Sequence, residues 1–569
     1  MKPLIVGTRG SKLAILQAME VEKQLKLSGI RCEIKTLSSL GDRSLGGDLS
    51  SKVGQFVHGI DEALIEGAVD ITVHSAKDIP IEGMRGVNTL AYMERDVTSD
   101  LILANGIEEW PSLREVLESS RSKSLISIMK SVPMKSKIGT VAGRRQSFLL
   151  SSRPDIIPIS VRGHIETRMN RLIENLVDYL ILAEVGISRL YNAGHITEEA
   201  LELKALRIKE KDWPTAPGQG AIAVNCRVQD EERFCELRTI LNHIPTEEDV
   251  SKERSLLGLI GGGCLFPAGI KSEGRVITAA ISPKDWRTRY SRGDTYKIHR
   301  YIGDTDGFNF TSNEAEEKHV QSFPKDSPKL VTTLTSDRLT SQLRKEGVPT
   351  LNVPVVKLRP LIDNWPVRFL EQFGVRSRWP ILVLTSPFAA KCAVEVSKIN
   401  PEIGQIAWLA LGEGTHKACF EEGVTVSHCG MVANSEQLLE YIVSNVKREI
   451  SLYVPRSSKS DYRFIESLME KGFGVEHWIA YENMSITPDT CSLSEEDVLL
   501  ISSSSSAESW SSNRLKVPKT VLSMGKSTTE TVETIPYFVG CEIITLEGPT
   551  VDYITSFWKS KVEGREIED

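Results

Sequence analysis

The sequence lacks the patterns that hold metal ions or build disulfide frameworks. Its nine cysteines are odd in number and scattered, with no Cys-x-x-Cys pair, and its ten histidines show no His-x-x-x-His spacing. Neither a zinc site nor a disulfide framework is therefore indicated. The sequence also has no apolar run near the ~20 residues that span a bilayer, and its start has no apolar core of signal-peptide length. We expect a cytoplasmic, reduced and metal-free protein with no membrane partner.

An excess of positive charge is missing as well. The formal net charge of -7 argues against a protein that binds nucleic acid with its whole surface. With 40% hydrophobic and 25% charged residues, the composition is that of an ordinary globular protein. A chain of 569 residues is too long for a single core, so about three to five domains are expected.

One stretch organises the first half of the chain: Val73-His74-Ser75-Ala76-Lys77-Asp78-Ile79-Pro80. A β-branched run leads into this polar cluster, and Pro80 ends regular strand pairing. Ligands of α/β sheets bind at the carboxyl ends of strands, and Lys77 can stabilise the charge of the neighbouring Asp78. The pattern favours a functional strand end. The alternative is a solvated turn with an incidental ion pair.

The chain begins with a pattern of the same kind. Leu4–Arg9 is typical of a first strand, and the apolar spacing from Ser11 to about Leu27 predicts a helix. Ser11 is suited to the N-cap position, so Arg9, Ser11 and the free N–H groups of the helix would converge on one anion-binding spot.

Polar clusters follow three later strands, which we expect at 137–140, 156–160 and 179–183. The clusters are Gly143-Arg144-Arg145-Gln146, Val161-Arg162-Gly163-His164 with Arg168, and Glu184-Val185-Gly186. Each arginine taken alone is typical of a surface. Several at the strand ends of one α/β unit instead indicate a polycarboxylate or polyphosphate ligand, because the guanidinium group binds such anions in a bidentate manner.

Further along, Gly261-Gly262-Gly263 precedes Cys264. Three glycines let the backbone approach a ligand closely and leave the thiol accessible, although a lone cysteine is more often a small buried hydrophobe. Pro217–Val224 predicts a turn and a strand that returns to the first domain. The polar segment 304–327 is predicted to be a linker.

Beyond the linker the sequence repeats itself. Leu384–Ala390 is similar to Ile501–Ala507, and Leu411–Thr415 is similar to Met524–Thr528, at a similar distance after each. This self-similarity indicates two related α/β units whose strand ends carry small hydroxyl and glycine residues. The alternative is that serine and glycine mark ordinary turns between strands and helices.

The motifs of the first half occur in the order seen in the hydroxymethylbilane synthase (porphobilinogen deaminase) family. They are Thr8–Ser11, Val73–Pro80, Gly143–Gln146, Val161–Gly163, Gly218–Ala221 and Gly261–Cys264. The resemblance covers roughly residues 1–302. From about Pro328 onward, the paired serine and glycine turns resemble the uroporphyrinogen-III synthase family. Together the two resemblances imply a bifunctional tetrapyrrole enzyme.

The first resemblance implies a dipyrromethane cofactor attached covalently through Cys264, with porphobilinogen as the substrate. Asp78 matches the catalytic aspartate of the family: it would protonate the leaving amine, stabilise the resulting cation and remove the proton of the attacking pyrrole carbon. The other residues implied for cofactor binding are Lys77, Thr140, Arg144 and Arg145. Those implied for substrate binding are Arg9, Ser11, Arg145, Arg162, Arg168 and Gln219.

Two departures from the family pattern bear on the detailed contacts. The loop around Lys52–Phe56 is shorter and lacks a second lysine, and Val141-Ala142 stand where the family often has two serines. The additional segment 118–135 is expected to be a surface insertion.

The second resemblance implies hydroxymethylbilane as substrate and a cleft that acts by shaping it. Tyr481 is the candidate catalytic group, and a buried strand tyrosine is the equal alternative. The positions implied to line the cleft are Ser386, Thr415, Ser503, Ser527 and Thr528.

The implied fold class is α/β. It consists of two lobes like those of periplasmic binding proteins with a small α+β domain, followed by two flavodoxin-like domains. The expected bounds are lobe 1 at about 1–97 and 214–240, lobe 2 at about 98–213, and a third domain at about 241–303. The synthase half is expected at 328–569, divided into about 328–355 with 484–560 and about 356–483.

Two other hypotheses of function are compatible with the sequence. One is a binding-protein-like module that holds an anion without chemistry. The other is a C-terminal half that is only structural or regulatory. We expect a monomer whose partners are small molecules.

Overall fold

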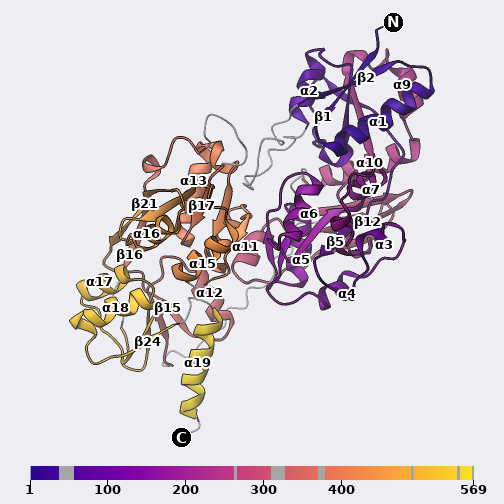
Figure 1. Cartoon of the computed structure of the whole chain (residues 1–569). Coiled ribbons are helices and arrows are strands. Elements are labelled where there is room, and N and C mark those ends of the chain that lie inside the picture. The colour runs from indigo at the N-terminus through magenta and orange to yellow at the C-terminus, as the bar shows by residue number, and fades with distance from the viewer. Residues whose placement is uncertain are drawn as a thin grey trace. The chain divides into compact units, whose positions relative to one another are not determined.

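The computed structural model covers the whole chain (Figure 1). It describes residues 2–37, 57–261, 266–308, 327–369, 379–432, 434–488, 492–546 and 551–566, so Cys264 and the Lys52 loop lie outside the described residues. The chain divides into two compact units. The first comprises Met1–Arg287 and Thr295–Asn313, and the second comprises Thr288–Asp294 and Glu314–Asp569.

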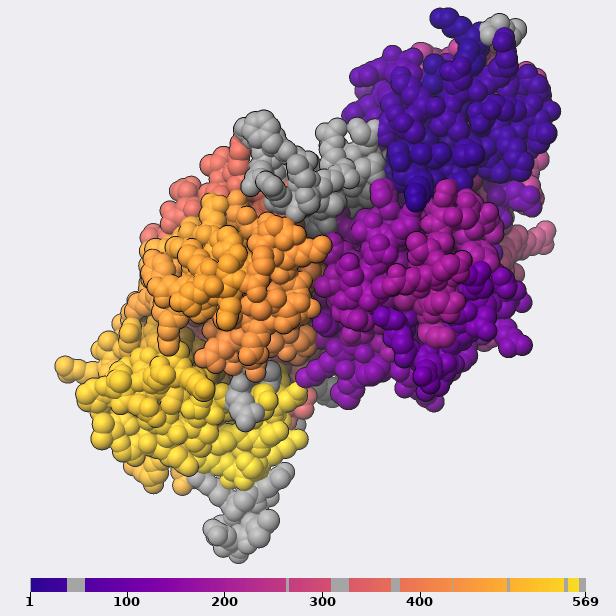
Figure 2. Space-filling view, viewed as in Figure 1, coloured from indigo at the N-terminus to yellow at the C-terminus, as the bar shows by residue number. Residues whose placement is uncertain are grey.

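The first unit begins with a mixed sheet of strand order β2-β1-β3-β10-β4. Its strands are β1 Leu4–Arg9, β2 Cys32–Leu37, β3 Ile71–Ser75, β4 Val87–Tyr92 and β10 Ile222–Arg227. β1 runs parallel to β2 and β3, whereas β10 lies antiparallel between β3 and β4. The predicted return of the chain near Ile222 is thus confirmed, and Figure 2 shows pink residues of this later segment beside the indigo start of the chain.

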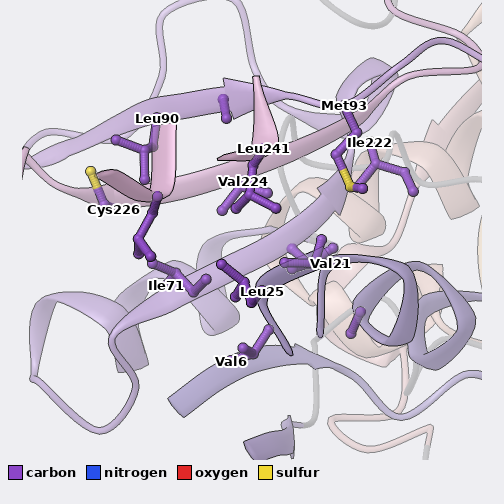
Figure 3. Packing of buried hydrophobic residues seen from close by; sticks show 14 of the residues in the cluster. Val6, Val21, Leu25, Ile71, Leu90, Met93, Ile222, Val224, Cys226 and Leu241 are labelled. Carbon is purple, nitrogen blue, oxygen red and sulfur yellow. The ribbon is translucent and has the colours of Figure 1, made fainter. Parts of the chain in front are cut away.

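Helices α1 (Lys12–Leu27), α2 (His58–Ile65) and α9 (Cys235–Leu241) belong to this part of the first unit. The Ser11 hydroxyl caps α1 by accepting the Ala14 N–H at 3.2 Å, as the sequence predicts. Figure 3 shows Val21 and Leu25 of α1 reaching toward the sheet residues Ile71 and Val224. Full burial of each such side chain contributes roughly 1.5–3 kcal/mol, which holds the helix on the sheet.

A second sheet has the strand order β7-β6-β8-β5-β9. Its strands are β5 Asp100–Ala104, β6 Lys137–Gly139, β7 Ile157–Ile159, β8 Tyr179–Ala183 and β9 Lys204–Arg207. β6 runs parallel to β7 and β8, and each of these three strands leads into a helix. Those helices are α5 Gly143–Ser152, α6 Ile165–Ile173 and α7 Glu184–Asn192, so the three polar clusters lie at one edge of the sheet.

Three short helices, α3 Leu113–Leu117, α4 Leu125–Lys130 and α8 Glu198–Leu201, accompany the second sheet. Helix α4 buries Leu125, Ile128 and Met129. Most residues of segment 118–135 are exposed, as expected of a surface insertion, and the buried side chains of Leu125, Ile128, Met129 and Val132 attach it to the unit.

The first unit ends with the antiparallel sheet β11-β12-β13, formed by Ala268–Glu273, Val276–Ile281 and His299–Gly303. Helix α10 (Ile244–Leu259) packs Leu256 and Leu257 against it. The helix begins at Ile244, because Pro245 is compatible with the first turn of a helix. Helix α11 (Trp286–Ser291) follows β12.

The second unit contains two sheets. The sheet of order β15-β14-β22-β23-β24 is entirely parallel and consists of β14 Leu330–Thr332, β15 Thr350–Asn352, β22 Val498–Ile501, β23 Thr520–Ser523 and β24 Glu542–Thr545. The other has the order β16-β21-β20-β17-β18-β19 and consists of β16 Val356–Pro360, β17 Ile381–Leu384, β18 Ala407–Ala410, β19 His428–Cys429, β20 Leu452–Ser457 and β21 Val475–Ser485.

The helices of the second unit are α12 Arg338–Lys345, α13 Pro387–Ile399, α14 Glu413–Glu421, α15 Ser435–Asn445, α16 Arg463–Glu470, α17 Ser504–Ser512, α18 Lys526–Thr534 and α19 Val551–Glu566. Within the described ranges, no helix of the chain is both long enough and apolar enough to cross a membrane.

The internal similarity of the second half corresponds to shared local structure. Ser386 and Ser503 each follow a buried strand and cap the next helix, accepting the N–H of the residue three positions later. Gly412 and Gly525 occupy the same N-cap place before α14 and α18. The repeated motifs are therefore equivalent strand-to-helix turns in two α/β sheets.

Candidate active site

The Lys77-Asp78 pair lies in a tight turn at the carboxyl end of β3. Ile71 and Val73 bury the strand in the core, and residues Ala76–Asp78 then form one turn of 3-10 helix. The glycine loop 217–220 approaches this turn closely: a Cβ at Gly218, whose φ is +77°, would lie 3.1 Å from the backbone of Ala76 and Lys77. Asp78 is half-buried, so its carboxylate lies where a ligand can reach it.

Lys77 is held by Gln219, the residue after Gly218. Its Nζ donates to Oε1 of Gln219 at 3.1 Å. Burial lowers the pKa of Lys77 to about 8; Asp78 opposes that shift, and the positive charge of Arg145 adds to it. Lys77 is therefore still mainly charged at neutral pH and loses its charge under mildly alkaline conditions.

Asp100, at the start of β5, is the charged centre of the second sheet. Its fully buried carboxylate accepts Nη2 of Arg144 at 2.7 Å and Nε and Nη2 of Arg145 at 2.9 and 2.6 Å. It also accepts the indole N–H of Trp213 at 2.8 Å and Nε2 of Gln219 at 3.0 Å. Burial alone would raise the pKa of Asp100, but the two guanidinium groups hold it well below its usual range.

This network changes how Arg144 and Arg145 are understood. Arg144 also donates to the Pro214 carbonyl at 3.0 Å, and Arg145 donates to the Ile181 carbonyl at 3.1 Å. Much of their hydrogen-bonding capacity is therefore already used within the protein. The sequence analysis missed Asp100, although a carboxylate that begins the apolar strand Leu101–Ala104 signals a buried charge that needs partners.

Further arginines gather around Arg168, which lies within electrostatic range of Asp78. Arg168, on α6, donates Nε to the Gly163 carbonyl at 2.8 Å. Burial, followed by the charges of Arg145, Arg162 and Arg9, lowers the pKa of Arg168 to about 10, whereas Asp78 raises it. Arg9 from the first sheet, together with Arg145 and Arg162 beside the second, thus lies within electrostatic range of Arg168. The expected convergence of the strand ends is present in the structure.

Two buried hydroxyl groups at the same edge of the second sheet are available to a ligand. Thr140 and Ser160 follow β6 and β7, and their hydroxyl oxygens have no hydrogen-bond partner among the described residues. A buried hydroxyl without a partner is destabilising unless a ligand or water satisfies it. The hydroxyl of Ser11, by contrast, already caps α1 by accepting one N–H, and it can still donate its proton.

Helix α10 connects this site to the segment that contains Cys264. Arg254 on α10 donates to the carbonyls of Ile79 and Pro80 at 2.8 and 2.6 Å, directly after the Lys77-Asp78 turn. The helix ends at Leu259, five residues before Cys264 in the sequence. Buried hydroxyl groups without partners among the described residues, several nearby cations and a helix bonded to the Lys77-Asp78 turn fit a carboxylate-rich ligand at this edge of the sheets.

In the second unit, Tyr481 on β21 is bonded to Ser386. The two hydroxyl oxygens lie 3.0 Å apart, and Tyr481 is only 7% exposed. Burial raises the pKa of Tyr481, although the Ser386 hydroxyl opposes this shift. The phenol therefore stays protonated at neutral pH, and its hydroxyl group has a defined hydrogen-bond partner.

Asn483, two residues further along β21, connects hydroxyl groups of both sheets of this unit. Its Oδ1 accepts the Ser457 hydroxyl at 2.9 Å, and its Nδ2 donates to Ser505 at 3.0 Å. Ser505 lies 3.1 Å from the hydroxyl of Ser503. The predicted positions Ser386, Tyr481 and Ser503 are thus linked to one strand, whereas the sequence analysis missed Asn483.

The remaining predicted positions lie in first turns of helices. Thr415 is buried on α14, after β18, and Ser527 and Thr528 begin α18, after β23. The Ser527 carbonyl accepts the Ser504 hydroxyl at 3.1 Å. These positions share the carboxyl edges of their sheets with Ser386 and Ser503.

Comparison with known proteins assigns both halves. Residues 4–234 match the family model "Porphobilinogen deaminase, dipyromethane cofactor binding domain", and residues 337–539 match "Uroporphyrinogen-III synthase HemD". A probable porphobilinogen deaminase of Methanocaldococcus jannaschii is 36% identical over 49% of this chain and 88% of that protein. The porphobilinogen deaminase of Geobacter sulfurreducens is 34% identical over 48% of this chain and 77% of that protein.

These matches agree with the two units of the structure and with the order of the sequence motifs. The chain therefore belongs to the porphobilinogen deaminase family and carries a uroporphyrinogen-III synthase domain in the same polypeptide, which makes it a bifunctional protein of tetrapyrrole biosynthesis.

Proposed function

We propose that the first half assembles four porphobilinogen molecules into hydroxymethylbilane with release of ammonia, and that the second half closes this product to uroporphyrinogen III with inversion of one ring. The observation that carries the first proposal is the half-buried residue Asp78, which lies next to Lys77 and within electrostatic range of Arg168, around which arginines of both sheets gather. Porphobilinogen carries an acetate and a propionate, which such cations attract.

Asp78 is the proposed general acid and base. In the acid form it protonates the departing amine of porphobilinogen, and the carboxylate left behind stabilises the cationic ring. When the α-carbon of the next pyrrole attacks, the same carboxylate removes the proton from that carbon. One group thus returns to its starting state after each addition, and the turn of Ala76–Asp78 holds it in place.

The dipyrromethane cofactor, when bound, supplies the carbon to which the first substrate is joined. We infer that Cys264 anchors it through a thioether and that Thr140, Lys77, Arg144 and Arg145 hold its carboxylates and pyrrole N–H groups. The orphan hydroxyl of Thr140 and the link from α10 to the Asp78 turn support this assignment. Arg9, Ser11, Arg162, Arg168 and Gln219 are assigned to the substrate and the growing chain.

For the second half we infer a cleft that holds the bilane curled between the carboxyl edges of its two sheets. Tyr481 would donate its proton to the departing hydroxyl of hydroxymethylbilane, since its pKa is raised and its hydroxyl is oriented by Ser386. Ser386, Thr415, Ser503, Ser527 and Thr528 are assigned to the substrate.

The finer fold assignment is also a proposal. We infer that the first two sheets are lobes like those of periplasmic binding proteins and that the two sheets of the second unit are flavodoxin-like. The proposed domain bounds are those expected from the sequence. We also propose that the protein is monomeric and cytoplasmic.

The mass of the intact purified protein tests the cofactor assignment. We expect the wild-type chain to be heavier than its sequence mass by one dipyrromethane, and Cys264→Ser to fold, lack the adduct and lose deaminase activity. Cys235→Ser, which alters an exposed cysteine of the same unit, is the matched control and should keep both the adduct and the deaminase activity. A fully active Cys264→Ser protein without an adduct would end this assignment.

A further inference from the structure

Arg456 is a buried cation for which no described residue supplies an anion. It lies at the carboxyl end of β20 and is only 7% exposed. Among the described residues, its Nε has no hydrogen-bond partner, and the guanidinium group makes only two long hydrogen bonds, from Nη1 to the carbonyl and hydroxyl of Ser460 at 3.3 and 3.4 Å. No carboxylate of the described residues forms an ion pair with it. Buried arginines almost always have such a partner.

The surroundings of Arg456 leave the edge of its guanidinium group available. The group stacks on the ring of Tyr462, with 4.0 Å between the guanidinium carbon and the ring centroid. Stacking occupies a face of the planar group, while its N–H donors project from the edge. Tyr462 is the N-cap residue of α16, whose first backbone N–H groups also favour an anion.

A second unpartnered nitrogen lies in the same cluster. Nδ1 of His477 is buried without a hydrogen-bond partner, and the His477 ring packs edge-on against Tyr462 at 5.6 Å between centroids. Burial, and next the charge of Arg456, lower the pKa of His477 below 6.5. His477 is therefore neutral at pH 7 and can donate one hydrogen bond from the imidazole.

Arg456 also lies at the edge of the sheet where the synthase half carries its other candidate residues. β20 is bordered by β17, which leads to Ser386, and by β21, which carries Tyr481. The next residue, Ser457, donates to Asn483. Ligands of such sheets bind beyond the carboxyl ends of the strands.

We propose that Arg456, together with His477, binds one acetate or propionate carboxylate of the linear tetrapyrrole in the synthase half. This inference rests on the proposed function of that half. The carboxylate completes the charge pair that the protein itself leaves open, and it orients the bilane relative to Tyr481. Arg456 is thereby a substrate-binding residue of the cyclisation reaction.

The test uses the full chain with hydroxymethylbilane as the substrate of the synthase half, and compares Arg456→Met and Arg456→Lys with the wild type. We expect KM for the bilane to rise roughly 10- to 100-fold in Arg456→Met, the range for loss of hydrogen bonds to a charged group. KM for Arg456→Lys should lie between the wild-type value and that of Arg456→Met, because lysine keeps the positive charge but cannot donate two parallel hydrogen bonds to a carboxylate. At low bilane concentration, type I uroporphyrinogen should accumulate.

Arg448→Met is the matched control. Arg448 also stacks on an aromatic ring, 4.7 Å from the centroid of Phe473, but it is exposed and precedes β20 at the opposite end of the strand. Its removal should leave KM unchanged. Unfolding midpoints of all variants show whether a change in KM reflects binding, and an unchanged KM in a folded Arg456→Met protein would overturn the proposal.

A second measurement needs no variant: a crystal structure of the wild-type chain with uroporphyrin III. A carboxylate oxygen within hydrogen-bond distance of the Arg456 guanidinium supports the proposal, and all carboxylates lying elsewhere would overturn it. Inorganic phosphate bound at Arg456 together with unaltered bilane kinetics would also overturn it. Failure of the underlying function looks different, because the wild-type chain would then give only type I product from the bilane.

Discussion

Replacing Asp100 by asparagine tests the charged centre of the second sheet. The substitution keeps the shape of the side chain but removes the charge that faces Arg144 and Arg145, all three being buried. Removing one partner of a buried ion pair costs about 3–5 kcal/mol, because the remaining charges are left without compensation. That is a large part of the ~5–15 kcal/mol that stabilises a typical domain.

Urea unfolding followed by tryptophan fluorescence is the assay, since fully buried Trp213 donates its indole N–H to Asp100. With a slope of about 2 kcal/mol per molar urea, the midpoint should fall by roughly 1.5–2.5 M. Glu198→Gln, which removes a carboxylate that is 83% exposed and paired with Arg114, is the control. It should lower the free energy of unfolding by no more than about 1 kcal/mol.

The pH dependence of this difference follows from the depressed pKa of Asp100. A depressed pKa contributes stability above the unfolded value of about 4, and that stability is lost only as pH falls toward the folded value. The gap between wild type and Asp100→Asn should therefore be constant from about pH 5 to 9 and shrink below about pH 4. If Asp100→Asn lowered the free energy of unfolding by less than about 1 kcal/mol at pH 7, the reasoning would be refuted.

Three other predictions concern the active site. Asp78→Asn should keep the unfolding midpoint but lower the rate of ammonia release by at least ~10²–10⁴-fold; near-normal turnover would move the acid–base role elsewhere. Arg162→Ala removes a half-buried cation that we propose binds substrate carboxylates, so partly elongated enzyme species should appear in the mass spectrum, and their absence would argue against a binding role. Lys77 has a folded pKa of about 8 against 10.5 in its ordinary state, so the folded chain binds fewer protons between these values. The free energy of unfolding of the wild type should therefore rise relative to Lys77→Met from about pH 8 to 10.5, and equal slopes would contradict the assigned pKa.

Local signals in the sequence were sufficient for the elements that carry the site. The capping serine before α1 and the apolar strand that leads to Asp78 are both present as predicted. The repeated serine turns of the second half correspond to equivalent caps at Ser386 and Ser503. These features depend on residues a few positions apart, which periodicity and capping rules describe well.

Contacts between distant residues could not be predicted in this way. Asp100 meets Arg144 through the packing of α5 on the second sheet, and it meets Gln219 from another part of the chain. Asn483 joins Ser457 to Ser505 because two sheets meet beside β21. The ion pair of Asp100 with Arg144 could not be predicted from the sequence, because the carboxylate lies 44 residues before that arginine.

Isomer analysis of the product of the intact chain tests the central claim most directly. Hydroxymethylbilane closes spontaneously without inverting its last ring, so only an active synthase half gives the type III isomer. Incubated with porphobilinogen alone, the intact chain should yield uroporphyrinogen III as the main product by chromatography, whereas a chain ending near Ser327 should yield type I. Type I as the main product of the intact chain would contradict the account.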